Sequence, residues 1–307
     1  MIILFTHNDI DGYGCALVLQ YYYGKENVTV IYTVPGAISS KVDKFIHSDK
    51  VKDYDKIFIT DISVCNTLAE KIDKMGLDVT LLDHHKTAVK LNKFNWCHVE
   101  INEGDDLASG TSLTYNYLIN NNQVPNKNLE IIVRAIQLYD TWMWKDKYDV
   151  QYPRDLNLLF DIYGGEKFVD NYLSRINDSN FQLINEFEEK LVEIEKDRME
   201  RVINSKLSQV IKTKLKVNKK EYTVGLCFAD QYKNDIGHAI CESDPTLDFV
   251  IMNTNLNTMS FRTCKDIDLT KISKRFGGGG HASAAGCAID KNIRNKAIQY
   301  VLNKSRR

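Results

Sequence analysis

The chain has 307 residues, which is long enough for two domains of about 150 residues each. Hydrophobic residues make up 43% of it, enough for ordinary protein cores. Its 40 basic and 41 acidic residues give a net charge of -1, which argues against the broad positive surface of duplex DNA-binding proteins.

The first half of the chain alternates short apolar runs with segments of helical periodicity. Strands are predicted at residues 2–5, 28–32, 57–60, 79–82 and 97–101. Helices are predicted at residues 12–23, 37–48, 64–75, 109–121 and 129–139. This alternation is typical of βαβ units, and continuous apolar strands are typical of a parallel sheet that is buried on both faces.

A long, charge-rich helix is predicted at residues 181–202, where Ile184, Phe187, Leu191 and Ile194 repeat at spacings of three, four and three. A coiled-coil seam is one interpretation of this repeat. A connector between domains is favoured, because a helix of this size spans roughly 30 Å at about 1.5 Å per residue.

After this helix the alternation starts again. Strands are predicted at residues 222–228, 247–252, 258–262 and 286–289, and helices at 235–242, 269–276 and from 292 onward. We therefore predict an α/β protein with three parts. These are a parallel-sheet domain at 1–180, a connector helix at 181–204 and a smaller α/β domain at 205–307.

The seven cysteines and the N-terminus predict a cytoplasmic protein. An odd number of cysteines without a CxxC pair argues against a disulfide framework and against a thiolate zinc site. The apolar N-terminal run covers only residues 1–5, too short for a signal peptide, and no window approaches the roughly 18 apolar residues of a membrane span. We expect no membrane partner.

Polar side chains follow directly after three of the early predicted strands. They are His7, Asp9 and Asp11 after the first strand, Asp61 after the third, and Asp83, His84 and His85 after the fourth. Because ligands of open α/β sheets bind outside the carboxyl ends of the strands, we expect these groups to converge on one edge.

The spacing and type of these side chains suggest a metal site. His7, Asp9 and Asp11 are two residues apart, which in an extended segment places all three on one side. A carboxylate-rich site with some imidazole suits Mn²⁺ or Mg²⁺ better than zinc, and so many acidic groups require cations nearby, two rather than one. Any one of these aspartates alone could be a turn former or a helix cap.

Two local details accompany this site. Neighbours in an extended chain face opposite ways, so only one of His84 and His85 should bind the same metal ion. Small residues open the first helix at Gly12, Gly14, Cys15 and Ala16. They could admit a ligand to the helix N-terminus or permit tight packing, and the sequence favours neither.

The second half carries a candidate anion site. The glycines at residues 277–280 could form a nest of backbone N–H groups, with His281 directly after them. A flexible linker is the alternative, and the position between a predicted helix and an apolar strand argues against it. Arg262 ends a predicted strand, and its planar guanidinium suits a phosphate. Trp142 and Trp144 could stack on a base, although core packing is favoured.

Five motifs in this order resemble the DHH/DHHA1 phosphoesterase superfamily across almost the whole chain. They are His7-Asn-Asp9-Ile-Asp11-Gly12, the isolated Asp61, Asp83-His84-His85, Asp140 within Tyr139-Asp-Thr-Trp142, and Gly277-Gly-Gly-Gly280-His281-Ala-Ser-Ala-Ala-Gly286. The opening run Leu-Phe-Thr-His-Asn-Asp-Ile-Asp-Gly is most similar to the nanoRNase B branch, whose members degrade short RNA.

The resemblance implies a role for each residue. One metal ion would be held by His7 and Asp9, the second by Asp11, His84 and Asp140, and Asp61 would bridge the two. Asp83 would orient a ligand histidine, as metal sites commonly require, and His85 would face the scissile phosphate, so that His85, Asp83 and Asp61 are the expected catalytic residues. Substrate phosphate or base would be bound by Arg262, Gly278, Gly279, Gly280 and His281. Only the resemblance identifies Asp140 as a candidate ligand; the sequence pattern alone does not.

The resemblance therefore implies a phosphodiesterase that hydrolyses short single-stranded RNA to mononucleotides by two-metal catalysis, in the manner of a 3′–5′ exonuclease. Mn²⁺ is the expected ion and Mg²⁺ the alternative. A RecJ-like DNA exonuclease would carry further nucleic-acid-binding modules, and the near-zero net charge agrees with a short substrate and no duplex DNA partner.

Alternative activities are an adenosine 3′,5′-bisphosphate phosphatase and a phosphodiesterase for cyclic or linear dinucleotides. A nucleotide-binding module without catalysis would be expected to lack a metal ligand, yet every ligand position carries a competent side chain. A homodimer is compatible with the sequence.

Overall fold

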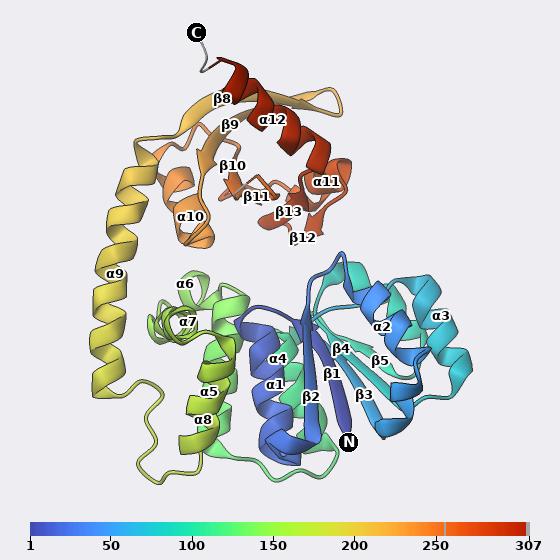
Figure 1. The fold of residues 1–307 in the computed structure, drawn as a ribbon. Helices are drawn as coiled ribbons and strands as arrows, with labels where there is room; N and C mark the ends of the chain where they lie inside the picture. Colours follow the sequence, from blue (N-terminus) through green and yellow to red (C-terminus); the bar gives the residue numbers. More distant parts are fainter. Residues whose placement is uncertain (255, 305–307) are drawn as a thin grey trace. The chain divides into compact units, whose positions relative to one another are not determined.

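The computed structural model describes residues 1–254 and 256–304, and the chain divides into two compact units, Met1–Glu193 and Ile194–Arg307 (Figure 1). Each unit is built around its own β-sheet, a five-stranded sheet in the first and a six-stranded sheet in the second. In the described part of the chain, no helix is both long enough and apolar enough to cross a bilayer.

The first unit contains the predicted alternation of strands and helices. Its strands are β1 (Ile2–His7), β2 (Val28–Thr33), β3 (Lys56–Thr60), β4 (Val79–Asp83), β5 (Cys97–Val99), β6 (Asn102–Glu103) and β7 (Asp106–Leu107). Its helices are α1 (Ile10–Tyr23), α2 (Ile38–Ile46), α3 (Asn66–Met75), α4 (Gly110–Asn120), α5 (Lys127–Asp140), α6 (Met143–Asp146), α7 (Tyr152–Tyr163) and α8 (Gly165–Arg175). Short 3₁₀ helices lie at Lys25–Asn27, Asp49–Asp53 and Lys86–Lys93.

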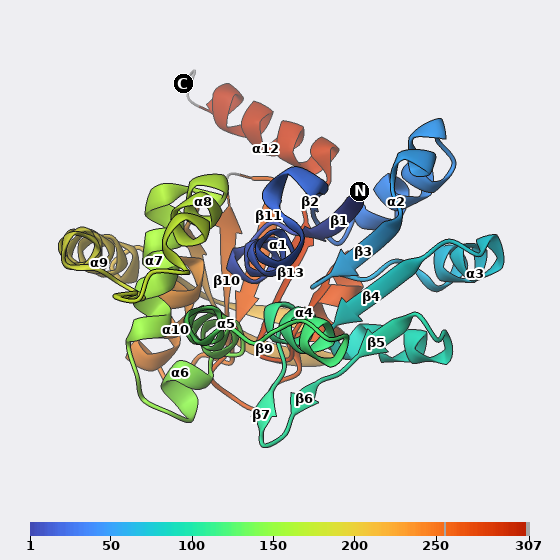
Figure 2. The ribbon, with the colours of Figure 1, turned by 90° about the horizontal axis from the view of Figure 1, so that it is seen from below.

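The main sheet of the first unit is entirely parallel, in the order β2-β1-β3-β4-β5. Both faces are buried, which explains why its strands are continuous apolar runs. On β1, Ile2 and Leu4 belong to the core formed with α1, α4 and α5, whereas Ile3 and Phe5 belong to the core formed with α2 and α3. Figure 2 shows α1 and α4 on one side of this sheet and α2 and α3 on the other.

The order of the strands creates a binding position at β1 and β3. These strands are neighbours, but the helix after β1 packs on one face of the sheet and the helix after β3 packs on the other. The connections therefore diverge at the carboxyl ends of the two strands, which is the position where open α/β sheets bind ligands. The predicted polar residues follow β1, β3 and β4 at this edge.

The predicted fold class is confirmed, with differences in detail. The sequence reasoning did not identify α6, α7, α8 or the small hairpin of β6 and β7. The five core strands and the five early helices occur at the predicted places, with ends shifted by up to two residues. The missed helices lie after α5, where no predicted strand marked the boundaries between them.

The second unit begins within helix α9 and has a mixed sheet. Its elements are α9 (Glu186–Leu207), β8 (Ile211–Val217), β9 (Lys220–Phe228), α10 (Lys233–Ser243), β10 (Phe249–Thr254), β11 (Thr258–Arg262), α11 (Leu269–Ser273), a 3₁₀ helix at Lys274–Phe276, β12 (Gly279–Gly280), β13 (Ala284–Ala288) and α12 (Lys291–Lys304). The strand order is β12-β13-β11-β10-β9-β8, and only β9 and β10 pair in parallel.

Helix α9 differs from its prediction in bounds and in packing. It begins at Glu186 rather than at residue 181. Two residues of the expected apolar seam, Phe187 and Ile194, are each 65% exposed, while Val192 and Met199 are buried. The buried face also includes a carboxylate, Glu188, because its Oε1 accepts hydrogen bonds from side chains of the preceding helices. Within the single chain, the buried face of α9 is therefore not the face of the predicted repeat.

Candidate metal centre

The first group of candidate ligands lies where β1 passes into α1. His7 is the last residue of β1, and Asp9 caps α1 by accepting the backbone N–H of Gly12 at 3.1 Å. His7 Nδ1 lies 2.5 Å from Asp9 Oδ2 and 3.8 Å from Asp61 Oδ2. The ligand atoms of His7, Asp9 and Asp61 all lie within 4.8 Å of one another.

Asp11 reaches the centre by a different route from the one predicted. The helix already begins at Ile10, so Asp11 lies in its first turn, and an extended segment through His7, Asp9 and Asp11 is wrong. Asp9 ends the extended chain because its side chain satisfies the free N–H groups of the helix start. The Asp11 carboxylate is instead held by the N-terminus of α4, where the backbone N–H groups of Gly110 and Thr111 donate to it at 2.6 and 2.9 Å.

Asp61 occupies a central position directly after β3. Its backbone N–H donates to Leu82 of the neighbouring strand at 2.9 Å, and its φ of 57° turns the chain at this point. Its side chain is 2% exposed. One carboxylate oxygen faces His7, and the other lies 3.2 Å from His84 Nε2.

A second group of candidate ligands joins β4, α1 and α5. His84 Nε2 lies 3.5 Å from Asp140 Oδ2 and 3.8 Å from Asp11 Oδ2. Asp140 is the last residue of α5, and its ligand atom lies within 4.8 Å of those of Asp11 and His84. The structure thus brings together six side chains, in two groups of three, with Asp61 in the first group and in contact with His84 of the second.

The electrostatics of these groups fit bound cations. Burial raises the pKa of Asp61 and Asp140, and the nearby charges of Asp11 and Asp9 raise it further. Burial would also raise the pKa of Asp9, but the hydrogen bond and the charge of His7 outweigh it and the pKa is lowered. Within the described residues, the buried Oδ2 atoms of Asp61 and Asp140 have no hydrogen-bond partner. Oxygen ligands that lack a donor and repel one another suit a hard divalent cation.

Asp83 and His85 pair with each other next to this cluster, and their ligand atoms lie within 4.8 Å of those of Asp61 and His84. Asp83 Oδ1 lies 2.7 Å from His85 Nδ1, and it also accepts the backbone N–H of His84 at 2.8 Å. Asp83 therefore orients the ring of His85, whereas the resemblance led us to expect that it orients a ligand histidine. Burial opposes the charge on both side chains, but their mutual attraction dominates, so the pKa of His85 is raised and that of Asp83 is lowered to about 2.

The glycines near the centre are required for close packing. A Cβ on Gly12 would lie 2.1 Å from the backbone oxygen of His7, and one on Gly14 would lie 2.2 Å from Thr111 Oγ1. Packing thus explains why both positions carry glycine. Gly110 was missed: a Cβ there would lie 2.4 Å from Asp61 Cβ. The only sequence signal for it was its place directly after the capping residue Ser109.

The predicted substrate residues of the second unit are also well defined. Asn234 of α10 accepts hydrogen bonds from Arg262 Nε at 3.0 Å and from Nη2 at 2.6 Å. Gly279 and Gly280 form the short strand β12, paired with β13. A flexible linker is therefore wrong. A Cβ on Gly278 would lie 1.9 Å from the backbone oxygen of Gly286, which explains why glycine is needed there.

The two tryptophans next to Asp140 contribute mainly to packing. Trp144 is 4% exposed and belongs to a small core with Leu138 and Met143. Trp142 lies across it in an edge-on arrangement, with ring centroids 5.2 Å apart.

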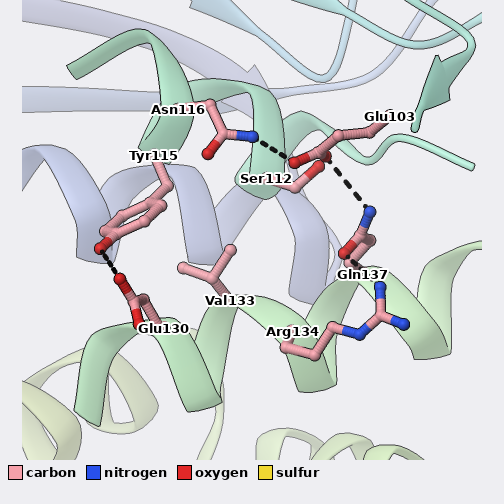
Figure 3. Close-up of a pocket in the computed structure, with 8 residues that line it drawn as sticks. All are labelled: Glu103, Ser112, Tyr115, Asn116, Glu130, Val133, Arg134 and Gln137. Atoms are coloured by element: carbon pink, nitrogen blue, oxygen red, sulfur yellow. Dashed lines mark hydrogen bonds between the residues drawn. The ribbon is translucent and has the colours of Figure 1, made fainter. Parts of the chain in front are cut away.

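A hollow of about 250 Å³ lies between α4 and α5 (Figure 3). Its polar side chains bond mainly to one another: Tyr115 donates to Glu130 at 2.8 Å, and Gln137 donates to Glu103 at 3.2 Å. Gln137 also donates to the backbone oxygen of Leu107 at 2.8 Å, so these bonds join α5 to the β6–β7 hairpin. We therefore interpret these residues as structural.

Comparison with known proteins agrees with this geometry. Residues 1–136 match the DHH family, N-terminal domain. The chain is 34% identical to the oligoribonuclease NrnB of Bacillus subtilis (strain 168) over 301 residues, which are 95% of this chain and 74% of that protein. It is 27% identical to the uncharacterized protein R106 of Acanthamoeba polyphaga mimivirus, over 94% of this chain and 67% of the relative.

Solved structures show the same fold at low sequence identity. RecJ from Thermus thermophilus, in complex with Mn²⁺, matches with a TM-score of 0.55 and 14% identity, over 95% of this chain and 50% of RecJ. A pGpG-specific phosphodiesterase, PggH from Vibrio cholerae, matches with a TM-score of 0.51 and 13% identity, over 99% of this chain and 98% of that chain.

Proposed function

Because the chain belongs to the DHH family and is a phosphoesterase of the hydrolase class, we propose that it hydrolyses short single-stranded RNA to mononucleotides with two divalent metal ions, Mn²⁺ first. The observation that carries this proposal is the convergence of His7, Asp9, Asp61, Asp11, His84 and Asp140 in two groups at one edge of the sheet. The 34% identity to an oligoribonuclease over 95% of the chain supports the substrate class.

We assign the ions to the two groups of ligands and catalysis to residues 1–180. His7 and Asp9 would hold one ion, and Asp11, His84 and Asp140 the other, with Asp61 between them. When bound, two such ions supply an activated water and neutralise the charge that develops on the phosphate. Two backbone N–H groups at the N-terminus of α4 fix the orientation of the Asp11 carboxylate.

His85 has the geometry of a group that contacts the substrate. Asp83 can only accept hydrogen bonds when ionised, so the proton on His85 Nδ1 faces Asp83. The raised pKa of His85 favours a second proton at Nε2, which could donate to a phosphate oxygen. We assign substrate binding to residues 205–307, through Arg262, Gly278, Gly279, Gly280 and His281.

A panel of substrates tests this proposal. The full chain is incubated with Mn²⁺ and with 5′-phosphorylated RNA dimers and pentamers, a long RNA, adenosine 3′,5′-bisphosphate, and linear and cyclic dinucleotides, and the products are resolved by ion exchange. We expect mononucleotides from the short RNAs and none after addition of EDTA. Faster turnover of the bisphosphate or of a cyclic dinucleotide would assign that compound as the substrate in place of short RNA. Nucleotide binding without any turnover would refute the proposed catalytic activity.

A further inference from the structure

Helix α10 of the second unit approaches the end of β11 very closely. A Cβ on Gly237 would lie 2.6 Å from Arg262 Cγ, so glycine is needed at this crossing. Cys241 is four residues further along the helix and therefore on the same face. Its Sγ donates to the backbone oxygen of Arg262 at 3.8 Å, and the side chain of Cys264, two residues after that strand, is close enough to affect the pKa of the Cys241 thiol. Two thiols from separate elements are thus neighbours.

A histidine on the same helix contacts the second thiol. His238 Nε2 lies 3.0 Å from Glu242 Oε1, and Nδ1 lies 3.1 Å from Cys264 Sγ. An ionised carboxylate only accepts hydrogen bonds, so Nε2 carries the proton of the neutral ring. Nδ1 is then an acceptor, and the Cys264 thiol is the donor. This is the arrangement in which a histidine takes the proton of a thiol and leaves a nucleophilic thiolate.

The two cysteines differ in accessibility. Cys264 is exposed, whereas Cys241 is partly buried. Burial raises the pKa of the Cys241 thiol to about 12. Cys264 is therefore the residue that a dissolved oxidant meets first, and Cys241 is placed to attack it afterwards.

We propose that Cys264 and Cys241 form a peroxide-reactive thiol pair, in which His238 activates Cys264 and Cys241 closes a disulfide. The Cys264 thiolate attacks hydrogen peroxide: a sulfur–oxygen bond forms, the oxygen–oxygen bond breaks, and the leaving hydroxide takes the proton from His238 to become water. The Cys241 sulfur then attacks the sulfenic acid, and a second water leaves with the Cys241 proton. In total, two thiols and one peroxide give one disulfide and two waters.

Peptide mapping of the full chain tests this pair. The reduced protein is treated with hydrogen peroxide, free thiols are blocked with iodoacetamide, and digests are analysed without reductant by mass spectrometry. We expect one cross-linked peptide pair containing Cys241 and Cys264, which dithiothreitol separates. Cys65 is a demanding internal reference, because it is also exposed and its hydrogen bond with the Thr67 hydroxyl lowers the pKa of its thiol, but the group bonded to it is a hydroxyl and not a histidine. At equal dose, Cys264 should react at least about ten times faster than Cys65.

Variants separate the two roles. In Cys241→Ser the reaction should stop at the sulfenic acid of Cys264, which dimedone labels. In Cys264→Ser, Cys241 should stay reduced, and Glu242→Gln should slow the oxidation of Cys264. Absence of the cross-linked peptide in the wild-type protein, or oxidation of Cys65 as fast as that of Cys264, would overturn the proposal, and neither result depends on the folding of a variant.

Discussion

Asp61 combines a left-handed backbone with a buried charge. Its φ of 57° lies in the region that aspartate and asparagine tolerate better than other non-glycine residues. Its side chain is 2% exposed, and burial together with the charges of Asp11, Asp9 and Asp140 raises its pKa. Burial of this charge therefore lowers the free energy of unfolding of the metal-free protein, and a bound cation would remove this penalty.

The substitution Asp61→Asn tests the cost of this buried charge, because asparagine removes the charge and also tolerates the left-handed backbone. We expect the metal-free variant to melt at a higher temperature than the wild type, because one repelling charge is gone. We expect it to lose the stabilisation by Mn²⁺, which for a bound ligand at one hundred times its Kd is about 2.7 kcal/mol. Activity should fall to background. Calorimetric melting with Mn²⁺ and with EDTA measures both effects, and an unchanged Mn²⁺ shift would exclude Asp61 as a ligand.

His85 is expected to affect turnover and not metal binding. Its ligand atom lies within 4.8 Å of those of Asp61, Asp83 and His84, but its Nδ1 is bonded to Asp83, and we assign the ions to the two groups that do not include it. His85→Ala should therefore retain the Mn²⁺ affinity of the wild type and lower kcat by about 100-fold to 1000-fold, the usual effect of losing one donor to a developing charge. Titration calorimetry and steady-state kinetics check the two parts, and loss of one metal site would transfer a ligand role to His85.

At the scale of elements, the N-terminus of α4 supports the centre. Two of its backbone N–H groups hold Asp11, and Gly110 lets the helix approach Asp61. A side chain larger than a hydrogen atom does not fit at residue 110, because a Cβ there would lie 2.4 Å from Asp61 Cβ and 2.9 Å from Asp11 Oδ2. Helix placement thus determines the shape of the centre.

Gly110→Ala should therefore weaken Mn²⁺ binding and activity together. The added methyl displaces Asp61 or the first turn of α4, and ligand displacement lowers both the affinity and the rate by at least about tenfold. Gly36→Ala is the matched control, because a Cβ there meets nothing within 4 Å. Equal behaviour of the two variants would show that the helix start can move without effect on the site.

A second element-scale feature is the carboxylate of Asp106 on β7. It accepts hydrogen bonds from Arg134 of α5 at 2.7 Å, from Lys147 at 2.5 Å and from Tyr148 at 2.7 Å. Asp140 lies in the chain between Arg134 and Lys147, so Asp106 ties down both sides of the segment that carries it. Burial opposes the charge of Asp106, but these three donors outweigh it and lower its pKa to about 2.

Asp106→Asn should lower the free energy of unfolding by about 1.5–3 kcal/mol, the usual range for hydrogen bonds to a charged group. The pKa of Asp106 is lower in the folded state than its ordinary value of 3.8, so its contribution is complete above about pH 4 and is lost as the pH falls toward 2. Denaturant unfolding of both proteins between pH 6 and pH 2 measures this. Asp105→Asn, at an exposed neighbour, is the control, and a difference that persists at pH 2 would contradict the ionic origin.

At the scale of the whole molecule, the candidate ligands and the candidate substrate residues belong to different units. The metal-ligand residues lie within Met1–Glu193, and Arg262 lies within Ile194–Arg307. We therefore propose that Arg262 contributes affinity only for substrates long enough to contact the second unit. Short RNA and a small chromogenic phosphodiester should respond differently to its loss.

Arg262→Ala should raise KM for RNA dimers to pentamers by roughly tenfold to a hundredfold, which corresponds to the loss of about 1.5–3 kcal/mol of charged hydrogen bonding. Hydrolysis of the small phosphodiester should hardly change. Arg275→Ala, which removes an exposed positive charge close in sequence, controls for the charge itself. Equal losses on both substrates would place Arg262 in the catalytic centre or in the fold.

The sequence alone determined the fold class and the edge at which the ligands gather. Apolar runs at residues 2–5 and 57–60 predicted buried parallel strands, because a strand covered on both faces must be apolar throughout. Polar residues directly after such strands then have to meet at one edge. His7, Asp61 and the pair His84 and His85 were therefore placed at this edge from sequence position, and the choice between the two histidines came from the family resemblance.

Only the tertiary structure decided how the remaining groups take part. Asp140 and Gly110 lie in helices whose ends reach the centre through packing that no local pattern encodes. Edge strand β8, with its alternating lysines, was missed because exposed strands lack a continuous apolar run. The backbone N–H at the left-handed turn of Asp61 bonds to Leu82 of the neighbouring strand, a contact that exists only once the sheet has formed. The pairing of Asp83 with His85 lies at and beyond the end of β4, where strand periodicity no longer predicts side-chain direction.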